Sequence, residues 1–167
     1  MCSSDLPQSV YAVTKLDGER RAQLASARTV VVRSGFIFGP GGRNFLSTLD
    51  ARLRLGEKVS AIADAWGTPT YARHLAARLR ELAQFDLPGT YHVVNSGSGA
   101  SYAEFAREVA LALGRDQAQV VDVRADSLSR PAPRPRDSRL RCLLSEAIGL
   151  APLPRWQEAV RDFIGAV

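Results

Sequence analysis

A run of β-branched residues at positions 29–33 constrains the fold of this sequence most strongly. An uninterrupted apolar run of this length is typical of a strand buried on both faces, as in a parallel sheet. Residues 9–27 before it have helical character, with Tyr11, Lys15 and Glu19 spaced four apart. A helix followed by a buried strand is half of a βαβ crossover, so the sequence predicts an α/β fold in which a parallel strand should precede the helix.

The rest of the sequence predicts short helices and strands. Apolar residues at helical spacing predict three helices, around residues 45–53, 75–82 and 156–163. Short apolar runs predict two strands, at residues 91–94 and 120–123. Ser101 and Glu104 form a capping box that should begin a further helix. The pattern predicts the end of a doubly wound parallel sheet, followed by a smaller lobe of mixed α/β structure.

The charge of the chain is carried almost entirely by arginine. The net charge is +5, and Lys15 and Lys58 are the two lysines among 22 basic residues. Because arginine makes planar, bidentate contacts to phosphate, this balance is compatible with an anionic small ligand, with nucleic acid, or with genome composition alone. The arginines of residues 124–141 have no interleaved aromatic residues and belong to no recognised nucleic-acid module. We therefore predict no nucleic-acid partner.

Cysteine usage and hydropathy predict a cytoplasmic protein. Cys2 and Cys142 have no metal-ligand spacing around them, so neither a disulfide framework nor a metal site is predicted. No run is long and apolar enough to span a membrane, and no secretory signal is evident. Residues 1–6 are polar and aperiodic and precede an abrupt start, so we expect them to be a non-native leader on a fragment of a longer protein.

Tyr11 and Lys15 are the first candidates for chemistry. At a spacing of four on a helix, the phenol and the ammonium lie on one face. The lysine charge should lower the pKa of the phenol from about 10, so that it could donate a proton near neutral pH. An exposed Tyr/Lys pair is also common on ordinary helices, so the pair alone does not establish a catalytic site.

Several segments in order resemble the extended short-chain dehydrogenase/reductases, and among them most closely the dTDP-4-dehydrorhamnose reductase family. The Tyr11–Lys15 helix is followed by a strand that runs into a loop ending in Arg43, Asn44 and Phe45. The resemblance continues through three later stretches, at residues 64–73, 102–106 and 134–140. It departs at Phe36 and Ala65, where the family commonly has tryptophan and glutamine. The Gly-rich phosphate turn of a dinucleotide fold is not in the sequence, so we expect the chain alone to bind a dinucleotide poorly.

The resemblance implies a fold, an activity and a site. The fold would be the C-terminal part of a Rossmann-like doubly wound sheet in residues 7–40, with a substrate-binding lobe in residues 41–167. The activity would be reduction of a dTDP-4-keto-6-deoxysugar by NADPH or NADH. Tyr11 would donate the proton and Lys15 would hold the nicotinamide ribose, and Ser34 and Gly35 would also contact the cofactor. The residues implied to bind the nucleotide sugar are Phe36, Asn44, Phe45, Thr70 and Arg134.

Two alternatives remain open on the sequence. The chain could derive from another nucleotide-sugar epimerase, dehydratase or reductase of the same fold. It could also be a non-catalytic homologue that binds a sugar nucleotide. A homodimer of the longer protein is left open as well. His74 shares the polar side of its helix with Arg78 and Glu81, and we predict that it is a surface residue without a catalytic role.

Overall fold

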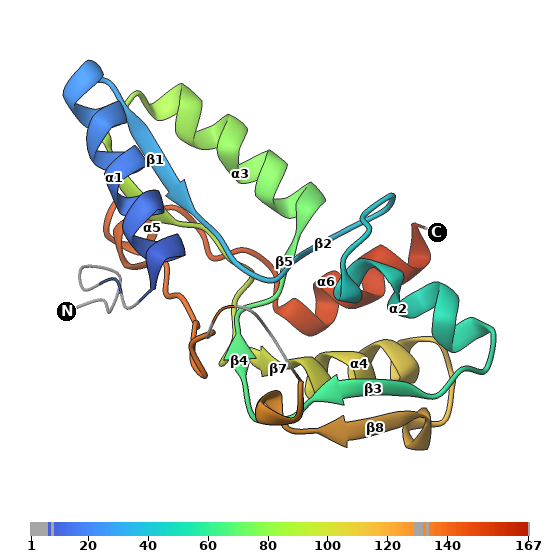
Figure 1. The fold of residues 1–167 in the computed structure, drawn as a ribbon. Helices are drawn as coiled ribbons and strands as arrows, with labels where there is room; N and C mark the ends of the chain where they lie inside the picture. The colour runs from blue at the N-terminus through green and yellow to red at the C-terminus, as the bar shows by residue number, and fades with distance from the viewer. Residues whose placement is uncertain (1–6, 8, 129–131, 133, 167) are drawn as a thin grey trace.

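The structure is a computed structural model that describes residues 7, 9–128, 132 and 134–166; the leader expected at residues 1–6 lies outside them. Its elements form two groups, one above the other in Figure 1. The sheet group contains α1 (Val10–Ala25), β1 (Val30–Arg33), α3 (Ala72–Phe85), β6 (Gly89–His92) and α5 (Leu143–Ala147). The helical group contains α2 (Phe45–Arg54), β3 (Val59–Ile62), α4 (Tyr102–Ala112), β8 (Val120–Val123) and α6 (Trp156–Gly165). Short strands connect the groups: β2 (Ile37–Phe38), β4 (Trp66–Gly67), β5 (Thr70–Tyr71) and β7 (Ala100–Ser101).

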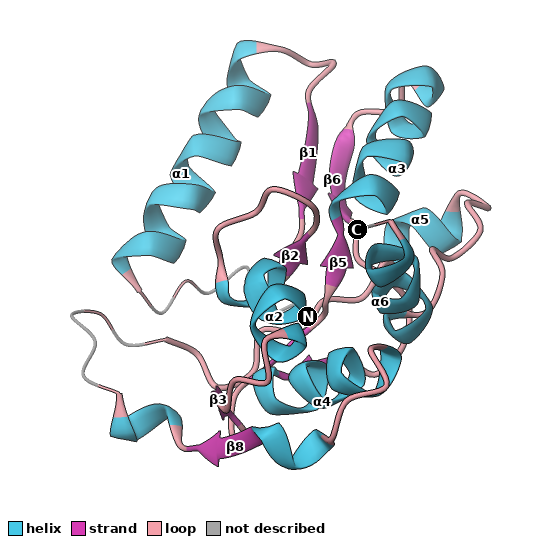
Figure 2. Ribbon diagram, turned by 90° about the vertical axis from the view of Figure 1, so that its right-hand side faces the viewer, coloured by secondary structure: helices cyan, strands magenta, loops and turns pink. Residues whose placement is uncertain are grey.

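Parallel pairing dominates the strands, as the sequence predicts. β1 pairs with β6, with Val30 opposite Gly89. β2 pairs with β5, and β3 pairs with β8, both in parallel. The pair β4–β7 is antiparallel, which gives the mixed character expected of the smaller part. Figure 2 shows β1 and β6 side by side, with α1 and α3 flanking them.

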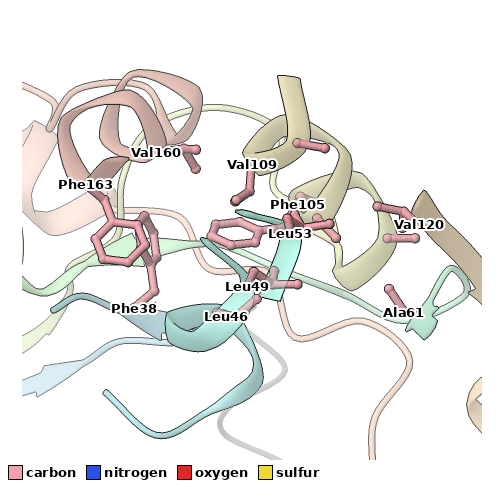
Figure 3. Close-up of a cluster of buried hydrophobic side chains, with 14 of the residues drawn as sticks. Phe38, Leu46, Leu49, Leu53, Ala61, Phe105, Val109, Val120, Val160 and Phe163 are labelled. Atoms are coloured by element: carbon pink, nitrogen blue, oxygen red, sulfur yellow. The ribbon is translucent and has the colours of Figure 1, made fainter. Parts of the chain in front are cut away.

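The hydrophobic core of the helical group follows the predicted helical spacing. Leu49 and Leu53 of α2 are fully buried, as is Phe105 of α4. The ring of Phe38 packs edge-on against Phe105, with centroids 4.9 Å apart, and against Phe163 of α6 at 5.6 Å. Figure 3 shows these rings meeting between the three helices. Helices α2, α4 and α6 all contribute apolar side chains to this core, and Phe38 of the connecting strand β2 completes it.

The sheet group is packed less completely. The predicted strand at 29–33 was expected to be buried on both faces, yet all four residues of β1 are only half-buried. Among the described strands, β6 is the single partner of β1. No residue of α1 is buried, and the helix is tied down mainly by polar contacts. The shortest of them is the ion pair between Glu19 and Arg33, at 2.6 Å, with both side chains 19% exposed.

His74 and Arg78 on the polar side of α3 are covered, so the surface prediction for His74 is wrong. Nδ1 of His74 lies 2.9 Å from Nδ2 of Asn95, and Nε2 lies 3.3 Å from a carboxylate oxygen of Asp162. Arg78 is also buried and donates to the carbonyl of Ala151. The pattern of α3 alone could not reveal this, because the covering residues lie outside the helix, 21 residues away for Asn95 and 73 for Ala151. None of the described helices is long and apolar enough to cross a membrane.

Candidate functional site

Tyr11 and Lys15 lie at the end of α1 that projects beyond the carboxyl end of β1. Nζ of Lys15 is 5.5 Å from the centroid of the Tyr11 ring, so the two side chains share a face as predicted. The ion pair of Glu19 with Arg33 fixes the register between helix and strand. Tyr11 lies eight residues before Glu19, about 12 Å along the helix axis from it. Ligands of open α/β sheets bind outside the carboxyl ends of the strands, and the start of α1 lies beyond that end of β1 (Figure 1).

Ser34 and Gly35 follow β1 at the same end of the sheet. The hydroxyl oxygen of Ser34 is buried and has no hydrogen-bond partner among the described residues. A Cβ placed on Gly35 would meet no atom within 4 Å, so the space beside its backbone is open. An unpartnered hydroxyl next to open backbone is what a polar ligand ring lying against this turn would require. A cofactor contact at Ser34 and Gly35 stays a prediction.

Phe36 has an unusual backbone conformation for an aromatic residue. Its φ is +45°, in the left-handed region, where a bulky side chain costs on the order of 1–3 kcal/mol. Its ring packs on Tyr102 with centroids 4.4 Å apart. A Cβ on Gly67 would lie 2.3 Å from the Phe36 ring, so only glycine fits at that position. Phe36 is thus held between Gly67 and Tyr102, directly after the turn of Ser34 and Gly35.

Asn44 and Thr70 are engaged in the scaffold of the site. Oδ1 of Asn44 accepts from the N–H of Ser47 at 3.0 Å and caps α2, while Nδ2 donates to the carbonyl of Ile37 at 2.9 Å. The side chain of Thr70 is fully buried and donates to the carbonyl of Thr68. The N–H of Thr70 donates to the carbonyl of Phe36 at 3.1 Å. In this structure Thr70 supports Phe36 rather than lining an open surface, because no part of its side chain is accessible.

A pocket of about 480 Å³ opens in the helical group, between the β3–β8 pair, α4 and the connection that follows β8. Phe45 and Arg134, both singled out from the sequence, line it. Its volume is within the range of small-ligand sites. The remaining lining residues are Ser60, Ala61, Ile62, Tyr102, Val123, Leu128 and Ala132. The pocket therefore combines aromatic and aliphatic walls with one guanidinium.

Tyr102 is the site residue that sequence reasoning missed. It is the first residue of α4, and the predicted capping box of Ser101 and Glu104 is present in full. Its ring also meets Phe45 edge-on, with centroids 5.7 Å apart. Tyr102 thus joins Phe36, at the end of the sheet, to Phe45 in the pocket. Its place next to the helix cap, within a stretch already noted for its resemblance, was the available signal.

Acidic and metal-ligating residues do not gather in the part of the chain that the structure describes. There, no three His, Cys, Asp or Glu side chains are close enough to hold a metal ion. Cys142 lies apart from the pocket, and burial raises the pKa of its thiol. Asp64, beside the pocket, has its pKa lowered chiefly by the N–H of Ala125, followed by Arg136, against the opposing effect of burial. The charged groups near the pocket are therefore arginines and the aspartates that pair with them.

Comparison with known proteins relates this geometry to a family. The model of the RmlD substrate binding domain matches residues 2–167. The dTDP-4-dehydrorhamnose reductase of Streptomyces griseus is 36% identical over 168 residues, covering 96% of this chain and 55% of the relative. The enzyme of the same name from Mycolicibacterium smegmatis is 34% identical over 164 residues, covering 96% and 50%. The chain thus spans about half the length of the curated relatives it matches.

Solved structures agree with the sequence relatives. The dTDP-4-dehydrorhamnose reductase of Bacillus anthracis, in complex with NADP, is similar with a TM-score of 0.85 and 28% identity over 94% of this chain and 55% of that one. A structure of the orthologue from Clostridium acetobutylicum has a TM-score of 0.84 and 29% identity, covering 96% and 56%. These similarities confirm the predicted fold class. The chain belongs to the RmlD substrate binding domain family.

Proposed function

We propose that this chain carries the proton-donating pair and the nucleotide-sugar site of an NAD(P)H-dependent reductase of a dTDP-4-keto-6-deoxysugar, such as dTDP-4-dehydrorhamnose. The observation that carries the proposal is a continuous path of contacts from the sheet end to the pocket. Gly35 precedes Phe36, which packs on Tyr102, and Tyr102 lines the pocket with Arg134. A ligand along this path would have one end in the pocket and the other at the turn after β1.

The chemistry of the pocket fits a nucleoside diphosphate. A planar base would pack against the aromatic side chains of Phe45 and Tyr102. Arg134 would donate to the oxygens of the diphosphate, for which a guanidinium has the right geometry. The sugar would then extend past Phe36 toward the carboxyl end of β1. In this arrangement Asn44 and Thr70 shape the site through α2 and Phe36 rather than by contacting the sugar.

The residues after β1 fit the nicotinamide end of a dinucleotide. Ser34 offers an unpartnered hydroxyl and Gly35 open backbone space. When bound, the NADPH or NADH would supply the hydride that reduces the keto carbon. Tyr11 would hold its phenol proton ready for the oxygen of that carbonyl, with the Lys15 ammonium beside it on the same face of α1. Lys15 would also hold the nicotinamide ribose by hydrogen bonding.

The proposal also covers the domain organisation of the protein and its location in the cell. Residues 7–40 would be the end of the dinucleotide-binding half and residues 41–167 the substrate lobe. Because β6 pairs with β1, β6 and the preceding α3 would return from the lobe to complete the sheet. The substrate would be a dTDP-sugar, and the protein would act in the cytoplasm. A homodimer of the longer protein is left as an alternative to a monomer.

Turnover tests the proposal. The longest open reading frame that contains this chain is expressed from source DNA, and NADPH oxidation is followed with dTDP-4-dehydrorhamnose. We expect turnover, and its loss in Tyr11→Phe, since the variant keeps the ring but has no proton to donate. Tyr71→Phe, at a buried tyrosine outside the site, is the matched control. Turnover of UDP- or GDP-sugars instead would favour another extended reductase, and unchanged turnover in Tyr11→Phe would contradict the catalytic role.

A further inference from the structure

Asp64 lies two residues after the end of β3, whose last residue, Ile62, lines the pocket. Its Oδ1 accepts the N–H of Ala125 at 2.7 Å, and its Oδ2 is bound by the guanidinium of Arg136. Nη2 of Arg124 is 3.8 Å from the same carboxylate. The Asp64 side chain is 22% exposed, so its contacts are partly shielded from water.

These contacts join two points that are far apart along the connection after β8. Ala125 is two residues past the end of β8, and Arg136 is eleven residues further on. Asp126 reinforces the junction, because its carboxylate is 2.5 Å from Nη2 of Arg136. The carboxylate of Asp64, reinforced by that of Asp126, therefore joins the beginning and the end of this connection.

The described residues between these points include part of the pocket wall. Leu128, Ala132 and Arg134 all line the pocket. Arg134 is two residues from Arg136, at most about 7 Å along an extended chain. The position of Arg136 therefore restricts where the guanidinium of Arg134 can reach.

We infer that Asp64 is a positioning residue of the nucleotide pocket: it fixes Arg136 and Ala125 so that Arg134 meets the diphosphate. The inference rests on the proposed function, since it concerns the same pocket. Asp64 itself would not contact the ligand, because its carboxylate is occupied by Ala125 and Arg136. A carboxylate facing the diphosphate without this pairing would repel it.

Substitution of Asp64 should leave the fold intact. The backbone of Arg136 is held separately by β4, since its carbonyl accepts from the N–H of Trp66 at 2.7 Å and the N–H of Ser138 donates to the carbonyl of Trp66 at 2.9 Å. Asp64→Asn keeps an oxygen for the N–H of Ala125 and removes one of the two charges that pair with Arg136, leaving that of Asp126. This variant therefore changes the position of the Arg136 side chain while leaving the strand pairing in place.

A double-mutant cycle with dTDP as the probe tests the inference. Binding to the 167-residue chain is measured by isothermal titration calorimetry for four proteins: unsubstituted, Asp64→Asn, Arg134→Ala and the double variant. We expect Arg134→Ala to weaken dTDP binding about tenfold, as for loss of a charge-assisted contact. Asp64→Asn should weaken it about fivefold, and the double variant should bind about as weakly as Arg134→Ala alone, since both changes remove the same contact.

Two controls separate positioning from general damage. Thymidine has no diphosphate, so its affinity should change by less than about twofold in Asp64→Asn, whereas a collapsed pocket would lose both ligands. Asp86→Asn removes an exposed ion pair with Arg28 in the sheet group and should leave dTDP binding unchanged. Three results would overturn the inference and leave the proposed function in place. They are unchanged dTDP binding in Asp64→Asn, losses of affinity that multiply in the double variant, and a loss of thymidine affinity equal to that of dTDP. If the unsubstituted chain binds no dTDP, the proposed nucleotide pocket is wrong and the inference fails with it.

Discussion

The helical group and the sheet group differ in how they are held together. In the helical group, Leu49 and Phe105 are fully buried and Phe163 is 1% exposed. In the sheet group, α1 buries no residue, and its Leu24 and Tyr11 are 88% and 71% exposed. The first group is stabilised by apolar packing, whereas α1 is held to β1 by the ion pair of Glu19 with Arg33 and to β6 by a hydrogen bond from Gln23 to Thr90.

This difference matches the two parts of the proposed function. The pocket for the nucleotide is built on the packed group, where Tyr102 follows a complete helix cap. The proposed proton donor, Tyr11, is on the sparsely packed helix. We therefore expect nucleotide binding to be a property of this chain by itself, and reduction to require further structure against α1 and β1.

The largest difference in stability between the two groups is expected from truncating one side chain in each. Phe105→Ala should lower the free energy of unfolding by about 3–5 kcal/mol, because it removes a fully buried ring that packs against Phe38. Leu24→Ala, on the exposed surface of α1, should change it by less than about 0.5 kcal/mol. Urea denaturation of both variants measures the difference. Equal losses would show that α1 is covered in solution and that the comparison of the two groups is wrong.

A smaller loss in the free energy of unfolding is expected from substituting Asn95, where the two groups meet. Its Oδ1 accepts from the N–H of Tyr71 at 2.8 Å, and its Nδ2 donates to the carbonyl of Pro154 at 2.9 Å. Asn95→Ala should cost about 2–3 kcal/mol, because these buried groups lose their partners. Asn44→Ala removes an exposed helix cap and should cost about 1 kcal/mol. A thermal melt that ranks the two variants in the opposite order would refute the structural role of Asn95.

Weakening the ion pair between α1 and β1 should have a smaller effect on stability, confined to α1. Glu19→Gln weakens the partly buried contact with Arg33 and should speed amide hydrogen exchange in α1 several-fold, with β3 and β8 unchanged. Asp17→Asn, which affects the exposed pair with Arg21, is the matched control and should have no measurable effect. Uniform acceleration throughout the chain would mean that the two groups unfold as one unit.

Acidification should remove the contribution that the Asp64 carboxylate makes to the stability of the fold. The N–H of Ala125 and the guanidinium of Arg136 hold the pKa of Asp64 below its ordinary value in the folded chain. The carboxylate therefore stabilises the fold at pH values above the unfolded pKa of about 3.9, and this contribution is lost as the pH falls from there through the folded pKa. The stability difference between the unsubstituted chain and Asp64→Asn should be constant from pH 5 to 7 (roughly) and shrink below about pH 4. A difference that grows on acidification would contradict this sign.

Local patterns in the sequence predicted the elements well where one segment contains the whole signal. The capping box of Ser101 and Glu104 is complete within four residues, and both of its hydrogen bonds are present. The spacing of Leu46, Leu49 and Leu53 likewise identifies the buried face of α2. Such signals depend on neighbours in sequence, so they could be read without the fold.

Features that depend on distant segments could not be predicted in this way. Arg78 looked like a surface residue because nothing in α3 shows that residues near 151 cover it. Asp64 is joined to Arg136 across 72 residues, and the sequence gives no sign of that pairing. The cap at Asn44 illustrates a third case: its amide in a resembling loop is predicted to bind ligand, and the structure shows both of its ends bonded to Ile37 and Ser47, so a ligand contact stays a prediction.

The most direct test of this account is amide hydrogen exchange of the chain with and without dTDP. The account predicts saturable protection in β3, β8 and the start of α4, the elements around the pocket, with no change in α1. Protection of α1 without protection of β3 and β8 would contradict it, because nucleotide recognition would then lie on the sheet group.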